Sequence, residues 1–502
     1  MKKYFLLLLI IGLCFGSCKK DDDGPIVEEE KVEETPEEVN IVVQNFMWQT
    51  LNAYYFWQED VPDLADDRFA TQSEYEDYLM DNPDPETFLT DELLFSEDRF
   101  TFYSNDYKEL TNFISGIAKS NGLEFGLSRI GDTDDVFGYV EYIIKNSNAA
   151  TKDIERGDVF IGVDGTRLTL NNFRDLLFGD NDTYTLNMAT IENNIISPIN
   201  AEVTLTKEEG LQEDPILVNK VLTIGDKKIG YLMYNQFQAG SGEELNQIFG
   251  TFKNQNISDL VLDLRYNSGG RGTTATILAS LIYAPNTEEL FFKTRYNAKL
   301  QELFGEDANN NFVSTTGTND GNTGATLNSL NLNKVYILAT DASASASELV
   351  MVGLEPYIDV VHIGSTTTGK NEGSLTFVDD PDNGNIYSRE REDQINPDNQ
   401  WALQPIISRV ENGAGFSDYA DGLIPDIELV EDVANLGMLG NENEPLLARA
   451  IQEITGVSAK RSFNVQIPGN LISSSKLFDD RRSVLILDNI KNTSKNPLGA
   501  LK

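Results

Sequence analysis

Apolar residues recur at helical spacing near the start of the chain. Between residues 41 and 57 they include Val43, Met47, Leu51 and Tyr54. This period is typical of an amphipathic helix whose apolar stripe packs into a core. We expect more short helices up to about residue 115. The pattern therefore predicts an N-terminal helical domain over residues 41–115.

Short strands separated by turn residues replace this pattern over residues 116–208. A short helix of small residues is expected at Asn148–Ala150, followed by a turn at Arg156-Gly157-Asp158 and a hairpin at Val163-Asp164-Gly165. Glycine, aspartate and asparagine between short apolar runs are typical of hairpins and loops. A small β-rich domain is expected here.

Strand and helix patterns alternate over residues 209–455. Apolar, strand-like segments are expected at Lys228–Gln236, Asp259–Leu264, Val335–Ala339 and Val360–Gly364. Helical patterns lie at Thr273–Tyr283, at Ser347–Tyr357 and behind Ser241, which has the spacing of a capping box with Glu244. Such alternation favours an α/β core. The signals of the C-terminal extension, residues 456–502, are mixed and predict no fold.

The N-terminus has the features of an export signal. The sequence MKKYFLLLLIIGLCFGSC combines a basic start, a short apolar run and small residues before Cys18. The run is too short for a membrane-spanning helix. It resembles the lipobox of bacterial lipoproteins, which implies removal of residues 1–17 and lipidation of Cys18, for example with palmitate. We expect an outer-membrane lipoprotein on the cell surface or the periplasmic face, and a plain signal peptide is the alternative.

Acidic residues dominate the next stretch and the chain as a whole. Residues 18–40 contain runs of Asp and Glu without apolar periodicity and are expected to be a tether. The formal net charge is -42, from 81 acidic and 39 basic residues. Such a chain repels phosphate backbones, so nucleic acid is excluded as an expected partner.

Few residues are available for imidazole or thiol chemistry. The chain has two cysteines, Cys14 and Cys18, and one histidine, His362. Neither cysteine is expected to remain a free thiol after export. Thiol nucleophiles, disulfides and multi-histidine metal sites are therefore excluded, and we expect no metal or cofactor.

Three turns rich in glycine or serine follow the strands of the α/β core. They are LDLRYNSGG, ending at Gly270, TDASASASE, ending at Glu348, and GSTTTGK, ending at Lys370. Strand ends that lead into helices are where α/β folds place reactive groups. Taken singly, each has a structural explanation: a tight glycine turn, a capping box and a solvated lysine. A phosphate-binding loop is excluded, because Asn371 follows the lysine where Ser or Thr is required.

Taken together and in this order, the three turns resemble those of the carboxyl-terminal processing (tail-specific) proteases. The helical region, the β-rich region and the late GLIPDIEL segment fit the same family. The resemblance implies a multidomain α/β fold with a ClpP/crotonase-like core, and a PDZ domain at 116–208 with a peptide-binding loop at Phe125-Gly126-Leu127. It also implies a serine–lysine dyad, with Ser345 as nucleophile and Lys370 as general base.

The same resemblance implies an oxyanion hole formed by the amides of Gly270 and Ala346. Asp263, Arg265 and Glu348 are expected to support the turns, and Thr367 to orient Lys370. The family often has a glutamine four residues after the lysine, where this chain has Ser374, so the group that orients the amine is left open. Burial at the interface between PDZ domain and core is expected to lower the pKa of Lys370.

These observations predict a serine endopeptidase that binds polypeptide C-terminal ends and hydrolyses peptide bonds. Its expected partners are unfolded polypeptides and, through the lipid anchor, a membrane. Two alternatives remain open at this stage. One is a catalytically silent peptide-binding lipoprotein, and the other is a structural lipoprotein of outer-membrane assembly. Sequence alone does not choose among Ser343, Ser345 and Ser347 as nucleophile.

Overall fold

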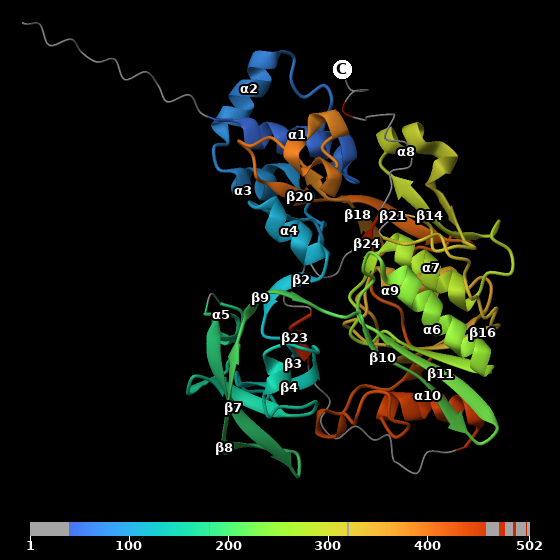
Figure 1. Ribbon diagram of the computed structural model, residues 1–502. Coiled ribbons are helices and arrows are strands. Elements are labelled where there is room, and N and C mark those ends of the chain that lie inside the picture. The colour runs from blue at the N-terminus through green and yellow to red at the C-terminus, as the bar shows by residue number, and fades with distance from the viewer. Residues whose placement is uncertain are drawn as a thin grey trace, which may run out of the picture. The chain divides into compact units, whose positions relative to one another are not determined.

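The computed structural model describes residues 40–179, 181–318, 321–457, 471–476, 485–487 and 498 (Figure 1). The described residues from Ile41 onward form one compact unit. The predicted signal peptide and the predicted lipidation site, Cys18, lie outside the described residues. Within the described ranges, no helix is long and apolar enough to cross a membrane.

The N-terminal region is helical, as the apolar spacing predicted. Its first helix, α1, buries Met47, Leu51 and Tyr54 completely. Thr71 caps α2 by accepting a hydrogen bond from the amide of Glu74 at 3.2 Å. The elements are α1 (Val42–Tyr54), η1 (Gln58–Asp60), η2 (Pro62–Leu64), α2 (Gln72–Asp81), α3 (Pro85–Thr87), η3 (Phe88–Leu93), β1 (Phe102–Ser104) and α4 (Tyr107–Ile114).

The next region is rich in β-strands and has its own apolar cluster. One sheet contains β3 (Leu123–Arg129), β4 (Val136–Ile143), β5 (Val159–Val163), β6 (Thr166–Arg167), β7 (Thr183–Glu192) and β8 (Ile195–Thr206). The strands β2 (Ile117–Ser120) and β9 (Glu208–Gln212) pair with each other in a separate two-stranded sheet. Two short helices, η4 (Ala149–Thr151) and α5 (Phe173–Phe178), accompany them. The hairpin predicted at Val163-Asp164-Gly165 joins β5 to β6, and Asp164 and Gly165 both have positive φ in its two-residue turn.

The structure corrects the loop expected at Phe125-Gly126-Leu127. These residues lie inside β3, which pairs with β4 on one side and with β23 (Leu471–Ser474) on the other. Alternation along the strand directs Phe125 and Leu127 into one apolar cluster, and this burial favours strand over loop.

The core sheet has the strand order β10-β11-β12-β16-β17-β22. Its strands are β10 (Ile216–Ile224), β11 (Lys227–Tyr234), β12 (Asp259–Asp263), β16 (Lys334–Ala339), β17 (Asp359–Gly364) and β22 (Ile427–Glu428). All neighbours except β10 and β11 are parallel. The expected α/β core is therefore present.

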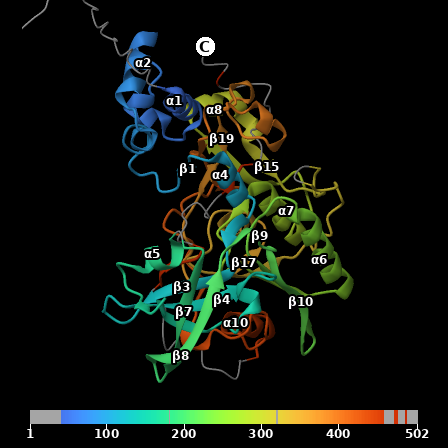
Figure 2. The same ribbon diagram turned by 60° about the vertical axis from the view of Figure 1, so that its left-hand side comes forward.

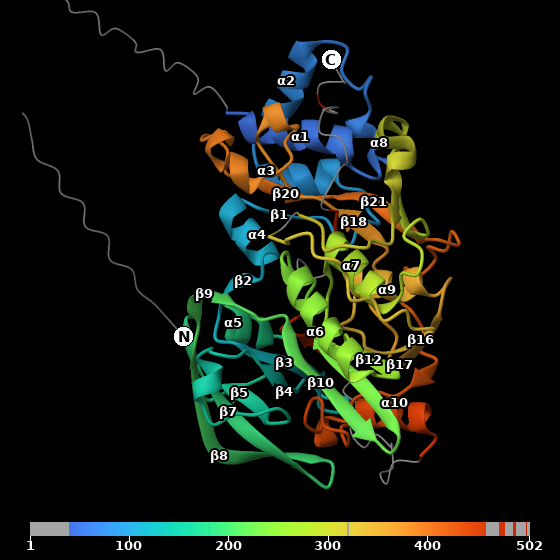
Figure 3. The ribbon, with the colours of Figure 1, turned by 45° about the vertical axis from the view of Figure 1, so that its right-hand side comes forward.

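Helices cover both faces of this sheet (Figure 3). Leu260 and Leu262 of β12 belong to the cluster that includes α6 (Ser241–Gln255), α7 (Gly272–Ile282) and α9 (Ala346–Leu354). Val261, between them, belongs to the cluster with α10 (Pro445–Thr455). Because both faces are buried, the strand reads as a continuous apolar run.

The predicted helix start at Ser241 is wrong by one residue. The N-cap of α6 is Gly240, with φ 80°, and Ser241 is the first helical residue. A glycine can adopt this left-handed conformation without strain, so the chain turns one residue earlier than the capping-box pattern indicated.

Two further sheets complete the unit. The larger has the order β13 (Gly270–Arg271), β24 (Leu485–Ile486), β18 (Glu372–Ser374), β21 (Ile406–Asn412), β14 (Leu290–Tyr296) and β15 (Asn309–Asn311). The smaller has the order β1, β20 (Ala402–Gln404) and β19 (Phe377–Val378), so β1 attaches the N-terminal region to the rest of the unit. Helix α4 contacts β1 (Figure 2). The remaining elements are α8 (Ala298–Phe304), η5 (Gly305–Ala308), η6 (Pro381–Asn383), η7 (Arg389–Gln394) and η8 (Val433–Asn435).

Candidate active site

The three turns singled out in the sequence meet at one edge of the core sheet. They follow β12, β16 and β17, which are adjacent and parallel, so their carboxyl ends lie side by side. The amide of Ala344 donates to the carbonyl of Asn267 at 3.2 Å, and the amide of Thr368 donates to the carbonyl of Ser343 at 3.0 Å. The serine turn therefore lies between the other two and is bonded to both.

Ser345 has an unusual backbone conformation at the start of α9. Its φ is 59° and its ψ is -109°, and α9 begins at the next residue, Ala346. A positive φ in a residue other than glycine costs about 1–3 kcal/mol, and such strain is concentrated at functional sites. Ser345 is 1% exposed. Ser345 is the N-cap of a capping box with Glu348, but its Oγ makes no hydrogen bond in the part of the chain that the structure describes.

The neighbouring serines differ from Ser345 in this respect. The hydroxyl of Ser343 donates to the carbonyl of Leu264 at 2.8 Å. The hydroxyl of Ser347 donates to the carbonyl of Asn267, also at 2.8 Å. Both are engaged in holding the turns together, which leaves Ser345 as the hydroxyl available for chemistry.

A buried carboxylate, that of Glu348, joins the serine turn to the lysine turn. Its Oε2 accepts hydrogen bonds from the backbone amides of Ser345, at 2.7 Å, and Lys370, at 2.9 Å. Its Oε1 accepts from the amide of Gly369, at 2.7 Å, and from the hydroxyl of Thr367. Burial raises the pKa of Glu348, and these hydrogen bonds act in the opposite direction. The four donors fix the two turns relative to each other.

Thr367 therefore has a different contact from the one expected. Its hydroxyl donates to Glu348 and accepts from the amide of Leu423 at 2.8 Å. It orients the carboxylate that holds the turns, so the expectation that it contacts the amine of Lys370 receives no support from these bonds.

Lys370 is completely buried at the end of the third turn. This burial lowers the pKa of its amine to about 8, although the carboxylates of Glu372 and Asp98 act in the opposite direction. At such a pKa about one molecule in ten carries a neutral amine at pH 7, against about one in 2,500 for a free lysine. The amine is thus prepared to accept a proton near neutral pH.

Two residues of the N-terminal region, Arg99 and Phe100, lie next to Lys370 or its turn. The ring centroid of Phe100 lies 4.5 Å from Nζ of Lys370. Nη2 of Arg99 donates to the carbonyl of Gly369 at 3.0 Å. The sequence led us to expect this cover from the 116–208 domain, but the contacting ring comes from residue 100, because β1 draws the N-terminal region onto the core.

Gly270 lies where only a glycine fits. Its φ is 131°, and a Cβ atom at this position would lie 2.3 Å from the carbonyl oxygen of Phe237. That carbonyl accepts from the amide of Arg271 at 2.8 Å. Ala346 is the first residue of α9, where helix amides lack intrahelical partners. Both predicted oxyanion-hole residues thus lie on turns of the same edge.

Ser374 is buried two residues beyond Glu372 on β18. Its Oγ accepts from Nε2 of Gln404 at 3.0 Å, and the Oε1 of Gln404 accepts from Thr376 at 2.6 Å. A glutamine is therefore present beside Ser374, but it comes from β20 rather than from the lysine turn. The sequence analysis did not identify Glu372 or Gln404 as residues of the site. Only Glu372 could have been identified, because it lies two positions after Lys370 in the sequence.

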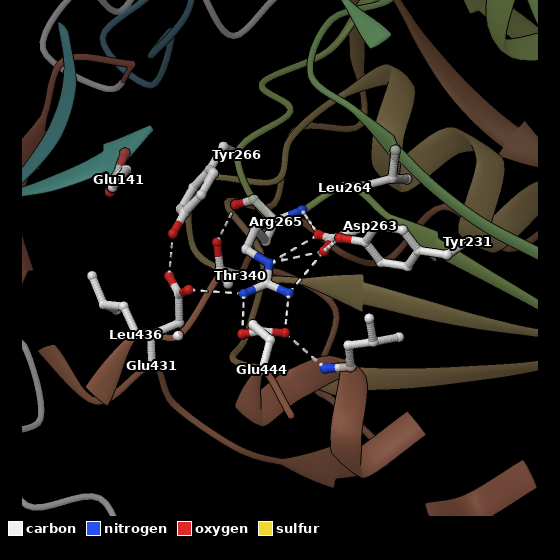
Figure 4. A network of polar contacts seen from close by, with 12 residues as sticks. Glu141, Tyr231, Asp263, Leu264, Arg265, Tyr266, Thr340, Glu431, Leu436 and Glu444 are labelled. Atoms are coloured by element: carbon white, nitrogen blue, oxygen red, sulfur yellow. Dashed lines mark hydrogen bonds and ion pairs between the residues drawn. The ribbon is translucent and has the colours of Figure 1, made fainter. Parts of the chain in front are cut away.

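Asp263 and Arg265 belong to a buried ionic network (Figure 4). Nη2 of Arg265 donates to Asp263 at 2.8 Å, and its Nη1 donates to Glu444 at 2.7 Å and to Glu431 at 2.9 Å. Arg156, from the turn before β5, also donates to Glu431, at 2.7 Å. The network ties the end of β12 to α10 and to the 116–208 region.

Residues 228–428 match the domain of peptidase family S41, and residues 42–102 match the S41 N-terminal domain. A Staphylococcus epidermidis protein named as a CtpA-like serine protease is 27% identical over 217 residues, which cover 41% of this chain and 40% of that protein. The chain thus aligns with less than half the length of the curated relatives that it matches.

Among solved structures, one from Bacteroides fragilis NCTC 9343, named as an S41 protease, has a TM-score of 0.61 and 25% identity. The alignment covers 82% of this chain and 97% of that one. Both comparisons agree with the three turns and with the resemblance to carboxyl-terminal processing proteases. The chain belongs to peptidase family S41, a family of serine-type peptidases.

Proposed function

We propose that this chain is a serine endopeptidase in which Ser345 is the nucleophile and Lys370 the general base. The observation that carries the proposal is the carboxylate of Glu348, which binds the amides of both residues through one oxygen. Ser345 has a strained backbone, and its hydroxyl makes no hydrogen bond among the described residues. Lys370 is buried, and this burial lowers the pKa of its amine.

The proposed reaction has two steps. Neutral Lys370 takes the proton of the Ser345 hydroxyl while Oγ forms a bond to the peptide carbonyl carbon, and the amides of Gly270 and Ala346 stabilise the oxyanion. The C–N bond then breaks, and the ammonium of Lys370 gives its proton to the departing amine. A water molecule, deprotonated by Lys370, hydrolyses the acyl-serine and restores the hydroxyl.

We also propose that residues 116–208 are a PDZ-like domain that captures the C-terminal ends of polypeptides. Strand β3 supports this, because one of its edges pairs with a short antiparallel strand, β23, from elsewhere in the chain. Addition of a peptide to a sheet edge is how PDZ domains bind their ligands.

The location proposed for the protein rests on its first residues. The apolar run before Cys18 and the small residues beside it support an exported lipoprotein of the outer membrane. Metabolic labelling with a radioactive palmitate tests this: label is expected in the intact chain and is expected to be lost in Cys18→Ala.

The peptidase proposal is tested with an unfolded polypeptide as substrate. Wild-type protein is compared with Ser345→Ala, Lys370→Met and the matched control Ser347→Ala, which loses only a structural hydroxyl. Cleavage that disappears in the first two and persists in the third is expected. Cleavage that persists in Ser345→Ala would contradict the assignment. Peptide binding without cleavage would instead favour the catalytically silent binder.

A further inference from the structure

The C-terminal extension supplies two short strands, and each is added to a sheet at a position that matters for peptide binding. One is β23, on the edge of β3, and the other is β24, between β13 and β18 (Figure 1). Residues 477–484, between them, lie outside the described residues. Both strands thus come from the region for which the sequence predicted no fold.

The first strand has the contacts of a bound peptide. The amide of Ser475 donates to the carbonyl of Phe125 at 2.8 Å, and the amide of Phe125 donates to the hydroxyl of Ser475 at 2.9 Å. Ile472 packs against the apolar cluster that contains Phe125 and Leu127. Residues 473–476 are buried, at 8% exposure or less. The residues predicted to bind peptide therefore already hold a segment of the same chain.

A buried ion pair extends this site by one residue. Nζ of Lys476 lies 2.7 Å from Oε2 of Glu213, and both side chains are less than 10% exposed. The hydroxyl of Tyr142 donates to the other oxygen of Glu213 at 2.7 Å. A buried carboxylate without its cation is costly, so this position favours a peptide with a basic residue. The chain continues beyond Lys476, so the occupant is an internal segment rather than a chain end.

The second strand fills a gap one strand wide beside the proposed catalytic residues. Leu485 pairs with Gly270 on one side, and Ile486 pairs with Ser374 on the other. The amide of Leu487 donates to the carbonyl of Ser374 at 3.1 Å. All three residues of the segment, 485–487, are buried, at 6% exposure or less. Gly270 belongs to the proposed oxyanion hole, and β18 begins two residues after Lys370.

The two sites are connected at the turn that carries Gly270. A cavity of about 40 Å³ is lined by Glu124, Glu213, Ser268 and Lys476, among others. Lys476, the last residue of the first site, thus lines the same cavity as Ser268, and Gly270, two residues after Ser268, pairs with Leu485 in the second site. One extended polypeptide can engage both sites.

We infer that residues 471–476 and 485–487 are an internal ligand, which occupies the peptide-binding edge of β3 and the strand gap between Gly270 and Ser374. Substrate must displace this segment, so the tail inhibits its own enzyme. The same contacts define the substrate class: an extended, unfolded polypeptide with a basic residue positioned at Glu213. This inference rests on the proposed peptidase function for its effect on turnover, but not for its effect on peptide binding.

A disulfide lock tests the inference in the full chain. Ser128 and Leu471 are directly paired, and the chain has no cysteine between residues 19 and 502. Residues that lie directly opposite each other in an antiparallel pair have Cα atoms about 4.5–5.5 Å apart, which is within the range of disulfides. The variant Ser128→Cys/Leu471→Cys is compared in oxidised and reduced forms, with the two single variants as controls. Mass spectrometry verifies the bond.

Two readouts separate this inference from the peptidase proposal. The first is anisotropy of a labelled peptide with the sequence of residues 470–476, measured on the locked variant that also carries Ser345→Ala. The second is cleavage of an unfolded polypeptide by the locked variant with Ser345 intact. We expect reduction to increase both binding and cleavage at least tenfold and to leave the single variants unchanged.

The outcomes are distinct. Redox-dependent binding without any cleavage would support the internal ligand and contradict the peptidase proposal. Equal cleavage and equal binding in both redox forms would overturn the internal ligand and leave the peptidase proposal standing. A probe peptide with Lys476→Glu is expected to bind at least tenfold more weakly, and equal affinity would contradict the role of Glu213.

A second variant, called the release variant, is designed to detach the tail from both sheets and so to increase cleavage. Ser475→Pro and Leu487→Pro together remove the amides that donate to Phe125 and Ser374. Cleavage by this double variant is expected to exceed that of the wild type at least tenfold, and Val457→Ala, an exposed change before the tail, is expected to have no effect. Unchanged or lower cleavage, with a thermal transition showing that the variant is folded, would overturn the inference.

Discussion

The backbone amides of Ser345 and Lys370 donate to the same atom, Oε2 of Glu348, at 2.7 and 2.9 Å. The two residues are 25 positions apart in the sequence and follow different strands of the core sheet. A shared acceptor fixes the distance between their backbones more tightly than packing alone, because displacement of either turn breaks a buried, charge-assisted hydrogen bond.

Replacement of Glu348 by glutamine tests this coupling. The amide oxygen can keep some of the four hydrogen bonds, but its NH2 group faces other donors, so kcat is expected to fall about 100-fold with KM little changed. The carboxylate also raises the pKa of Lys370, so the pH midpoint of kcat/KM is expected to move to lower pH. A fall in rate without any shift of the pH profile would indicate a structural effect only.

In the proposed mechanism, the pH dependence of the reaction follows from Lys370. Its amine must be neutral to accept the serine proton, and burial lowers its pKa to about 8. We expect kcat/KM to rise tenfold per pH unit below about pH 8 and to level off above it. Measurement on a peptide substrate without titratable groups checks this. A profile that is flat between pH 6 and 9 would contradict a lysine base.

The burial of the Lys370 ammonium group also lowers the free energy of unfolding. Its pKa is about 8 in the folded state and about 10.4 in the unfolded state, so both states are protonated at pH 7 and the buried charge destabilises the fold. Lys370→Met is therefore expected to raise the free energy of unfolding at pH 7 on the order of 3 kcal/mol.

Because the pKa of Lys370 is lower in the folded state than in the unfolded state, the free energy of unfolding depends on pH. Wild-type stability should rise between about pH 8 and pH 10.4, where the folded lysine is neutral and the unfolded lysine is still charged. The advantage of Lys370→Met should vanish above that window. Urea titrations of the wild type and of Lys370→Met at pH 7 and at about pH 10.5 measure their free energies of unfolding. A difference between the two proteins that does not change with pH would contradict a lowered pKa of Lys370 in the folded state.

Gly270→Ala tests the proposed oxyanion hole. The new Cβ would lie 2.3 Å from the carbonyl of Phe237, so the turn must move and its amide is displaced. Cleavage is expected to fall about 100-fold or more. Gly272→Ala is the matched control, since its nearest neighbour atom would be 3.5 Å away. A Gly270→Ala variant with an unchanged rate would exclude this turn from the site.

The alternation of strands and helices was sufficient to predict the α/β core and the meeting of the three turns. Apolar runs such as Leu260–Leu262 indicate parallel strands, and parallel strands bring their carboxyl ends to one edge. The choice of serine could not be predicted in this way. The hydroxyls of Ser343 and Ser347 are engaged by carbonyls 79 and 80 residues away, which no local pattern contains.

Two other features depend on contacts between distant segments. Phe100 covers Lys370 because β1 joins a sheet whose other strands come from residues 377–404. The tail strand β24 is only two residues long, too short for any periodicity, and its place is defined by its neighbours Gly270 and Ser374. Local sequence therefore predicted the turns but not what covers them.

The central claim, that Lys370 activates Ser345, is tested most directly with a serine-reactive fluorophosphonate. The release variant Ser475→Pro/Leu487→Pro is labelled at pH 9, digested and mapped by mass spectrometry, beside the same variant with Lys370→Met. We expect one adduct, on Ser345, and its loss in the Lys370→Met protein. An adduct on Ser343 or Ser347, or labelling of Ser345 that is equally fast without Lys370, would contradict the claim.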